Sequence, residues 1–186
     1  MKFLKALILF SVLLSFSANA LLEVNIIKSK EELFPVVIAP FEIIGDAHQG
    51  ADIANIIRDN LNRSGQFNAL STNELVTNQI DFNFWQEHKK DAVVFGKIEQ
   101  VSSKVFNIYI YIYDVFSEKS LYSKKIAVHN SGIRRIAHYL SDRIYYVLLG
   151  QKGSFDTRLS YVTVSESKKG NRTYRLQISD SDGYNP

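Results

Sequence analysis

The stretch 105–116 alternates isoleucine with tyrosine, and this pattern constrains the fold more than any other part of the chain. Isoleucine takes even positions and tyrosine takes odd ones: Ile108, Ile110, Ile112 and Tyr109, Tyr111, Tyr113. Because successive side chains of a strand point to opposite faces of a sheet, the pattern predicts a strand with an apolar core face and a half-covered aromatic face. The tyrosine rings are therefore candidates for a secondary interface with another domain or partner.

The flanking stretches predict that this strand lies in the middle of a meander. Residues 92–101 and 120–129 are β-prone, and only the short turns 102–104 and 117–119 separate them from it. Strands joined by loops this short pair in antiparallel fashion.

Two other segments repeat apolar residues at helical spacing. The first begins near Asp52, is expected to run for about four turns and ends at Gly65, since glycine suits the left-handed conformation just past a helix. The second runs from about Gly132 to Leu149 and is closed by Gly150.

Shorter apolar stretches on either side of the first helix predict strands. The run 35–40, bounded by prolines, and the stretch 66–70 predict a parallel pair with a right-handed crossover. The capping residues at 71–74 predict the start of another helical turn.

The C-terminal part of the chain predicts a linker and then a hairpin. The stretch 150–154 is glycine-rich and polar, and 159–165 and 174–179 are predicted strands joined by a polar turn. A two-stranded hairpin alone is only marginally stable, so we expect something further to pack on it. The final stretch 180–185 is similar to a calcium loop but has no bidentate glutamate after it, and its Asp-Gly pair favours a simple turn.

The N-terminus has the pattern of a secretory signal peptide. Lys2 and Lys5 precede an apolar run at 6–16, and Ala18 and Ala20 supply the small residues before a signal-peptidase cut. The run is shorter than the roughly 20 residues that span a bilayer, which favours a removed signal over an anchor. No cysteine follows the cut to carry a lipid. We therefore expect an exported, soluble chain that begins at Leu21.

The charge balance argues against nucleic acid or anionic lipid as a partner. The net charge is +3, and removal of residues 1–20 takes away two lysines and no acidic residue, which leaves +1. Both kinds of partner are recognised through clustered positive charge. The chain contains no cysteine, so packing without disulfides must hold the fold.

The sequence contains no motif for catalysis or metal binding. The histidines His48, His88, His129 and His138 have no metal-ligand spacing, so we expect surface or helix-face positions for them. Neither a Gly-x-Ser-x-Gly elbow nor a phosphate loop is present. The sequence predicts a protein that is not an enzyme and has no cofactor or metal. The alternative is an exported hydrolase with an unrecognised site, which an activity screen with each histidine replaced by alanine would reveal.

Several stretches, in this order and spacing, resemble the TolB family, periplasmic components of the Tol-Pal system of Gram-negative bacteria. They are 23–26, 36–41, 61–67, 91–96, 150–162 and 175–185. The resemblance implies an α+β domain, with two long helices packed on a mixed β-sheet, followed by a β-propeller. After the signal peptide at 1–20, it divides the chain into an arm at 21–34, this domain at 35–150, a linker at 151–157 and an incomplete first propeller blade at 158–186.

The resemblance also implies partners and a role. In the family, a flexible N-terminal arm binds the inner-membrane-anchored protein TolA by strand addition, and the system serves outer-membrane integrity and constriction at cell division. By position, the contact residues here are Leu21, Leu22, Glu23, Val24, Asn25, Ile26 and Ile27. Their apolar, β-prone composition suits strand addition, although the same stretch is also typical of a first domain strand. The lipoprotein Pal binds the family's propeller, so Pal binding is not expected of a chain with only the first strands of that domain.

Overall fold

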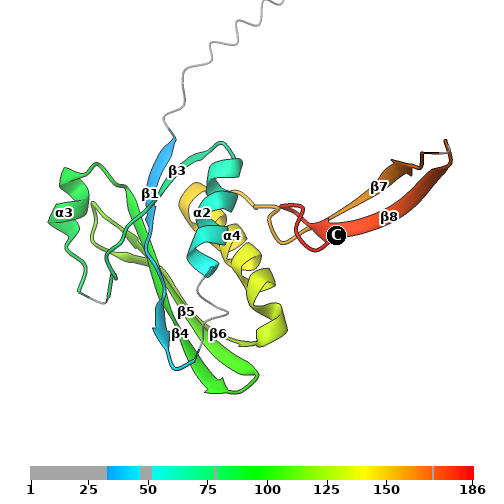
Figure 1. Cartoon of the computed structure of the whole chain (residues 1–186). Coiled ribbons are helices and arrows are strands. Elements are labelled where there is room, and N and C mark those ends of the chain that lie inside the picture. Colours follow the sequence, from blue (N-terminus) through cyan, green and yellow to red (C-terminus); the bar gives the residue numbers. More distant parts are fainter. Residues whose placement is uncertain (1–32, 47–51, 78, 169) are drawn as a thin grey trace, which may run out of the picture. The chain divides into compact units, whose positions relative to one another are not determined.

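The computed structural model describes residues 33–46, 52–77, 79–168 and 170–186 (Figure 1). The predicted signal peptide with Ala18 and Ala20, the arm residues Leu21 to Ile27, and His48 lie outside the described residues. The elements follow in this order: β1 (Phe34–Ile38), β2 (Glu42–Ile44), α2 (Ile53–Arg63), β3 (Phe67–Ser71), α3 (Phe82–Glu87), β4 (Ala92–Ser102), β5 (Val105–Asp114), β6 (Ser120–His129), the 3-10 turn η2 (Asn130–Gly132), α4 (Ile133–Leu149), β7 (Arg158–Glu166) and β8 (Arg172–Asp180).

The main sheet has six strands and mixed direction. Five of them follow the order β3-β1-β4-β5-β6, and β2 also pairs with β4. Strand β1 runs parallel to both β3 and β4, whereas β4, β5 and β6 form an antiparallel meander. The α+β fold with a mixed sheet and two long helices is therefore confirmed, as are the parallel pair around α2 and the meander.

The isoleucine face of β5 forms the centre of the core. Ile108, Ile110 and Ile112 are fully buried in a cluster that also contains the apolar residues of α2 and α4. Figure 1 shows these two helices together over one face of the sheet. The alternation in the sequence thus predicted correctly which face the helices cover.

The opposite face is covered in part by the short helix α3. Its Trp85 is buried in a second apolar cluster with Phe95 of β4, and Tyr111 and Tyr113 pack against this cluster. The ring centroids of Phe95 and Tyr111 are 5.1 Å apart in a stacked arrangement. The tyrosine face is therefore half-covered, as predicted, and much of the cover comes from the chain's own Val76, Ile80, Phe84 and Trp85.

The prediction of a helical turn at 71–74 is wrong, because the helix of this region is α3, at Phe82–Glu87. The hydroxyl of Thr72 accepts a hydrogen bond from the Glu74 N–H at 3.1 Å, a local turn that competes with helix formation. Leu75 is 60% exposed, so no apolar contact supports a helix there. In α3 the carboxylate of Asp81 caps the first turn by accepting from the Phe84 N–H.

The two long helices end where the sequence predicts. Gly150 closes α4 with a left-handed φ of +71°, and Gly65, just past α2, has the same value. Helix α2 has 11 residues, roughly three turns instead of the four expected. None of the helices in the described ranges combines the length and hydrophobicity needed to cross a bilayer.

The segment 151–157, expected as a linker, is fastened to α4. The ring of Phe155 is 8% exposed and packs edge-to-face on Tyr145. Both carboxylate oxygens of Asp142 accept backbone hydrogen bonds, from the Phe155 N–H at 2.7 Å and from the Asp156 N–H at 3.1 Å. The glycine-rich composition at 150–154 does not predict this attachment, because the buried residue, Phe155, lies just after that stretch.

Replacing Asp142 by asparagine is expected to loosen this attachment. The side-chain amide retains one acceptor but presents a donor to one of the two N–H groups, so the free energy of unfolding should fall by about 1–3 kcal/mol. Urea denaturation measures the loss, and proteolysis between 151 and 157 measures the local release. The exposed Asp59, replaced in the same way, is the control; equal effects at the two positions would contradict the assigned role of Asp142.

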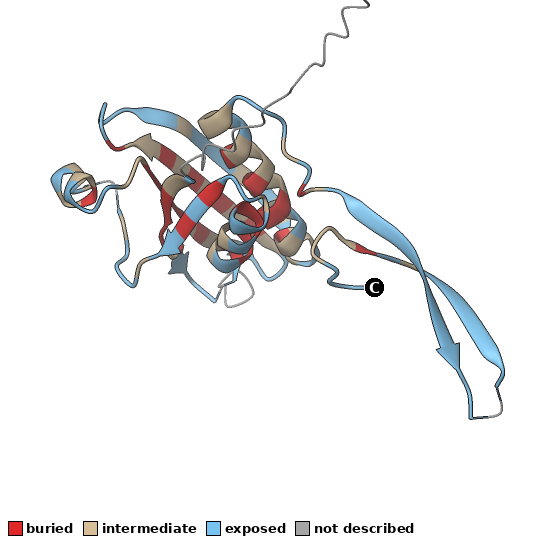
Figure 2. Ribbon diagram, turned by 90° about the horizontal axis from the view of Figure 1, so that it is seen from above, coloured by how far each residue is buried: buried red, intermediate tan, exposed pale blue. Residues whose placement is uncertain are grey.

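Strands β7 and β8 form the predicted hairpin, with Tyr161 opposite Gln177 in the antiparallel register. Both strands carry the exposed colour along most of their length in Figure 2. Several of the exposed side chains are large and apolar: Leu159, Val162, Val164, Tyr174, Leu176 and Ile178. These side chains leave an apolar surface on the hairpin, and the expectation that something further packs on it stays a prediction.

Candidate functional site

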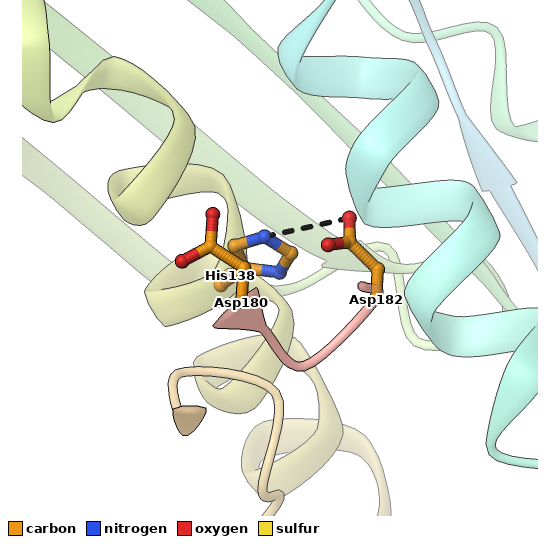
Figure 3. A group of neighbouring side chains, drawn as sticks. All are labelled: His138, Asp180 and Asp182. Atoms are coloured by element: carbon orange, nitrogen blue, oxygen red, sulfur yellow. Dashed lines mark ion pairs between the residues drawn. The ribbon is translucent and has the colours of Figure 1, made fainter. Parts of the chain in front are cut away.

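Helix α4 carries a buried histidine that lies beside two carboxylates from the turn after β8. His138 is 2% exposed, so it lies on a helix as expected but not at the surface. Figure 3 shows its ring between Asp180 and Asp182, and its Nε2 atom is 3.6 Å from Oδ2 of Asp182. The cluster joins positions more than forty residues apart in the sequence, 138 and 182.

The other ring nitrogen of His138 contacts helix α2. The side-chain Nδ2 of Asn60, a residue that is 1% exposed, lies 2.9 Å from Nδ1 of His138. The same Nδ2 donates to the hydroxyl of Ser141 at 2.9 Å, and that hydroxyl donates to the Ala137 carbonyl at 2.8 Å. The carbonyl oxygen of Asn60 accepts from the Arg63 guanidinium at 2.8 Å.

These partners fix the tautomer of His138. Because Arg63 is only a donor, the Asn60 oxygen must face it, and the Asn60 amino group must face the imidazole. The Nδ1 atom of His138 is then an acceptor, and the proton of the neutral ring is on Nε2, which points toward Asp182.

Arg134 supplies a positive charge that pairs with both carboxylates. Its guanidinium forms a very short contact with Asp182 and lies 3.5 Å from Oδ2 of Asp180. It also lies over the ring of Tyr184, 3.9 Å from the centroid. Helix α4 therefore holds the turn after β8 through charge and through an aromatic contact.

Burial and charge shift the pKa values of this cluster. Burial lowers the pKa of His138, and this outweighs the opposing effect of the Asp182 carboxylate. Burial alone would raise the pKa of Asp182, but the Tyr184 N–H and the Arg134 guanidinium outweigh it and hold that pKa below its ordinary value. The neutral imidazole and the ionised carboxylate are thus the favoured states near pH 7.

The cluster has the residue types of a cation site, but its hydrogen bonds fit an internal network better. Ligand atoms of His138, Asp180 and Asp182 all lie within 4.8 Å of one another. A ligating histidine offers a bare nitrogen to the ion and donates its other N–H to an acceptor. Here Asn60 donates to Nδ1, so the proton occupies Nε2, and Arg134 already pairs with both carboxylates. No spacing in the sequence indicates this cluster, for which no metal was predicted.

The tyrosine row divides into one charged and two apolar environments. The Tyr109 hydroxyl donates to Glu99 at 3.0 Å, and the amino groups of Lys97 and Lys125 lie 4.4 and 5.2 Å from its ring centroid. The bond from Tyr109 is the largest cause that lowers the pKa of Glu99. Tyr111 and Tyr113 instead pack on Phe95. Tyr109 therefore differs from the other two residues of the predicted secondary interface, because charged side chains surround it.

Residues 22–121 match the family model described as the TolB amino-terminal domain. The chain belongs to the TolB family. It is 57% identical over 169 residues to the Tol-Pal system protein TolB of Ruthia magnifica subsp. Calyptogena magnifica, an alignment that covers 91% of this chain and 40% of the relative. It is 53% identical over 167 residues to the protein of the same name from Vesicomyosocius okutanii subsp. Calyptogena okutanii, covering 90% and 39%.

A solved TolB structure has the same fold. The crystal structure of TolB from Acinetobacter baumannii superimposes with a TM-score of 0.70 at 32% identity, covering 83% of this chain and 38% of that one. The chain thus spans about two fifths of the length of the TolB relatives it matches. Both of these relatives are named as proteins of the Tol-Pal system. The matched family range includes the arm residues from Leu22 onward and the tyrosine row, and it ends before His138.

Proposed function

We propose that the chain is a non-catalytic periplasmic adaptor of the Tol-Pal system that binds TolA through Leu21 to Ile27. In this role it helps maintain outer-membrane integrity and constriction during cell division. The observation that carries the proposal is the family match, which begins at residue 22, directly after the predicted signal cut. The overlap of residues 22–27 with the matched range supports a role for these residues in the mature chain.

The composition of the arm supports strand addition as the binding mode. Residues 21–27 contain five aliphatic side chains and a single charged one, Glu23. An extended segment that adds to a sheet edge gains affinity from backbone hydrogen bonds and specificity from alternate side chains. In this proposal the tyrosine row, with Tyr109 at its charged end, is a secondary interface. Pal has no assigned contact, because the resemblance places Pal on the propeller.

The chemistry of the described residues supports an adaptor over a hydrolase. Buried His138 and Ser141 are both engaged by Asn60, and the Ser141 hydroxyl donates to a carbonyl of its own helix, so neither is poised as a base or nucleophile. The exposed His88 and His129 each contact a group within four residues along the chain. Turnover of a hydrolase substrate that is lost when one of these histidines is replaced by alanine would contradict the proposal.

Deletion of the contact residues 21–27 is expected to abolish binding of the TolA C-terminal domain. A chain that starts at Lys28 should bind at least about 100-fold more weakly than one that starts at Leu21, as measured by calorimetry. The point variant Val24→Pro should also weaken binding, because proline removes a backbone donor. Val24→Thr keeps that donor and is the matched control.

The expected result requires that the deletion leaves the domain folded. Circular dichroism and thermal melting of the two chains should agree, since the described core begins after the arm. Equal affinity with and without residues 21–27 would refute the assigned contact. Equal affinity of the proline and threonine variants would refute strand addition as its mode.

A further inference from the structure

The contact between Asn60 and His138 tolerates only one protonation state of the imidazole. Arg63 and Ser141 orient the Asn60 amide so that its amino group faces Nδ1 of His138. If Nδ1 gains a proton, two donors face each other at 2.9 Å, and this hydrogen bond between α2 and α4 is lost, which leaves the one from Asn60 to Ser141. Rotation of the amide would not repair it, because the amino group would then face the Arg63 guanidinium.

The charges around His138 act in both directions, because the carboxylates of Asp182 and Asp180 favour the protonated ring whereas Arg134 and Arg63 oppose it. Charged groups face the ring from α2, from α4, from the segment before β7 and from the turn after β8, some of them across a cavity of about 320 Å³. They are Arg63, Arg134, Arg135, Asp156, Arg158, Asp180 and Asp182. Four arginines face three carboxylates, and Asp182 and Asp180 are themselves paired with Arg134, and Asp156 with Arg135.

We propose that Asn60 and His138 form an acid-sensitive joint, which holds helices α2 and α4 together while the imidazole is neutral and loosens when it is protonated. The joint is a property of the folded domain and does not depend on a TolA contact. It gives this TolB-family chain a way to change the packing of α2 on α4 with the acidity of its surroundings.

The direction of the effect follows from the lowered pKa of His138. In the unfolded chain the imidazole titrates near its ordinary value of about 6.5, and in the folded chain it titrates lower. Below pH 6.5 the unfolded state binds more protons, so the stability contributed by the joint is fully present above that pH and is lost as the pH falls through the folded value. Asp182 adds to the loss only at lower pH, because its pKa lies below that of a free carboxyl.

The tautomer and titration of His138 in the full chain test the joint directly. Nitrogen-15 spectra of the imidazole are expected to show the proton on Nε2 at pH 7 and a midpoint below 6.5. Amide exchange at 56–64, corrected for its intrinsic pH dependence, should become faster between pH 7 and pH 5. The expected increase is about tenfold for each pH unit by which the pKa of His138 lies below 6.5. A proton on Nδ1 at pH 7, or a midpoint at or above 6.5, would overturn the proposal.

The variant Asn60→Asp is expected to reverse the acid sensitivity. The new carboxylate is an acceptor of nearly the same shape, so it can accept from a protonated Nδ1 and from Arg63, and the His138 midpoint should move above 6.5. The control is His88→Gln, which removes an exposed histidine and should leave the pH dependence unchanged. If the variant at position 60 keeps the wild-type midpoint, the proposal fails; if it does not fold, the wild-type titration still decides.

Discussion

Replacing Ile110 by alanine is expected to lower the free energy of unfolding by about 2–5 kcal/mol. The side chain is fully buried at the middle of β5, between the sheet and the helices α2 and α4, so its removal leaves a cavity that the surrounding structure closes only in part. Urea denaturation followed by the fluorescence of the single tryptophan, Trp85, measures the loss.

The neighbouring Tyr109 provides a control on the same strand. Tyr109→Phe removes the hydrogen bond to Glu99 on the half-covered face and should cost about 1 kcal/mol or less. Comparable losses for the two variants would show that the isoleucine face is not the core of the fold. The comparison also separates the structural face of β5 from the face proposed as a secondary interface.

Replacing Gly96 by alanine is expected to destabilise the sheet by about 1–3 kcal/mol, although the change adds only one methyl group. Gly96 lies opposite Ile110 in β4, and a Cβ there would overlap the backbone oxygen of Tyr109 and the ring of Phe41. The ring can shift, but the carbonyl is held in the sheet. The melting temperature and the urea midpoint of the variant measure the loss.

The double variant Gly96→Ala with Phe41→Leu distinguishes the two obstacles. A smaller side chain at 41 relieves only the clash with the ring. The double variant should therefore be less stable than Phe41→Leu alone, by most of the loss that Gly96→Ala causes in the wild-type chain. If the double variant shows no further loss, the backbone of β5 is less constrained than its register indicates.

Local patterns in the sequence were enough to predict most of the elements. The alternation at 105–116 correctly assigned Ile108, Ile110 and Ile112 to the core, because side-chain direction in a strand has a period of two. The ends of α2 and α4 were predicted because Gly65 and Gly150 permit a backbone conformation that other residues disfavour. The prediction at 71–74 was wrong because residues that cap helices also stabilise turns. The side chain of Leu75 is exposed, so it does not anchor a helix to the core.

The candidate site was harder to predict because its parts come from distant segments. Asn60 and His138 are 78 residues apart, so their hydrogen bond leaves no local spacing to detect. One signal was present: Arg134, His138 and Ser141 lie three or four residues apart and so share one row of α4, next to its apolar stripe. A polar row at that position predicts a buried network, but not its partners.

The sequence by itself determined most of the strands, the two long helices and membership of the TolB family, since these depend on local periodicity and on residues that the family shares. Only the tertiary structure decided that His138 is buried, which nitrogen carries its proton, and that Asp182 faces it. The physical reason is that protonation depends on the groups packed around a side chain. For His138 those groups come from α2 and from the turn after β8, which only folding brings to α4.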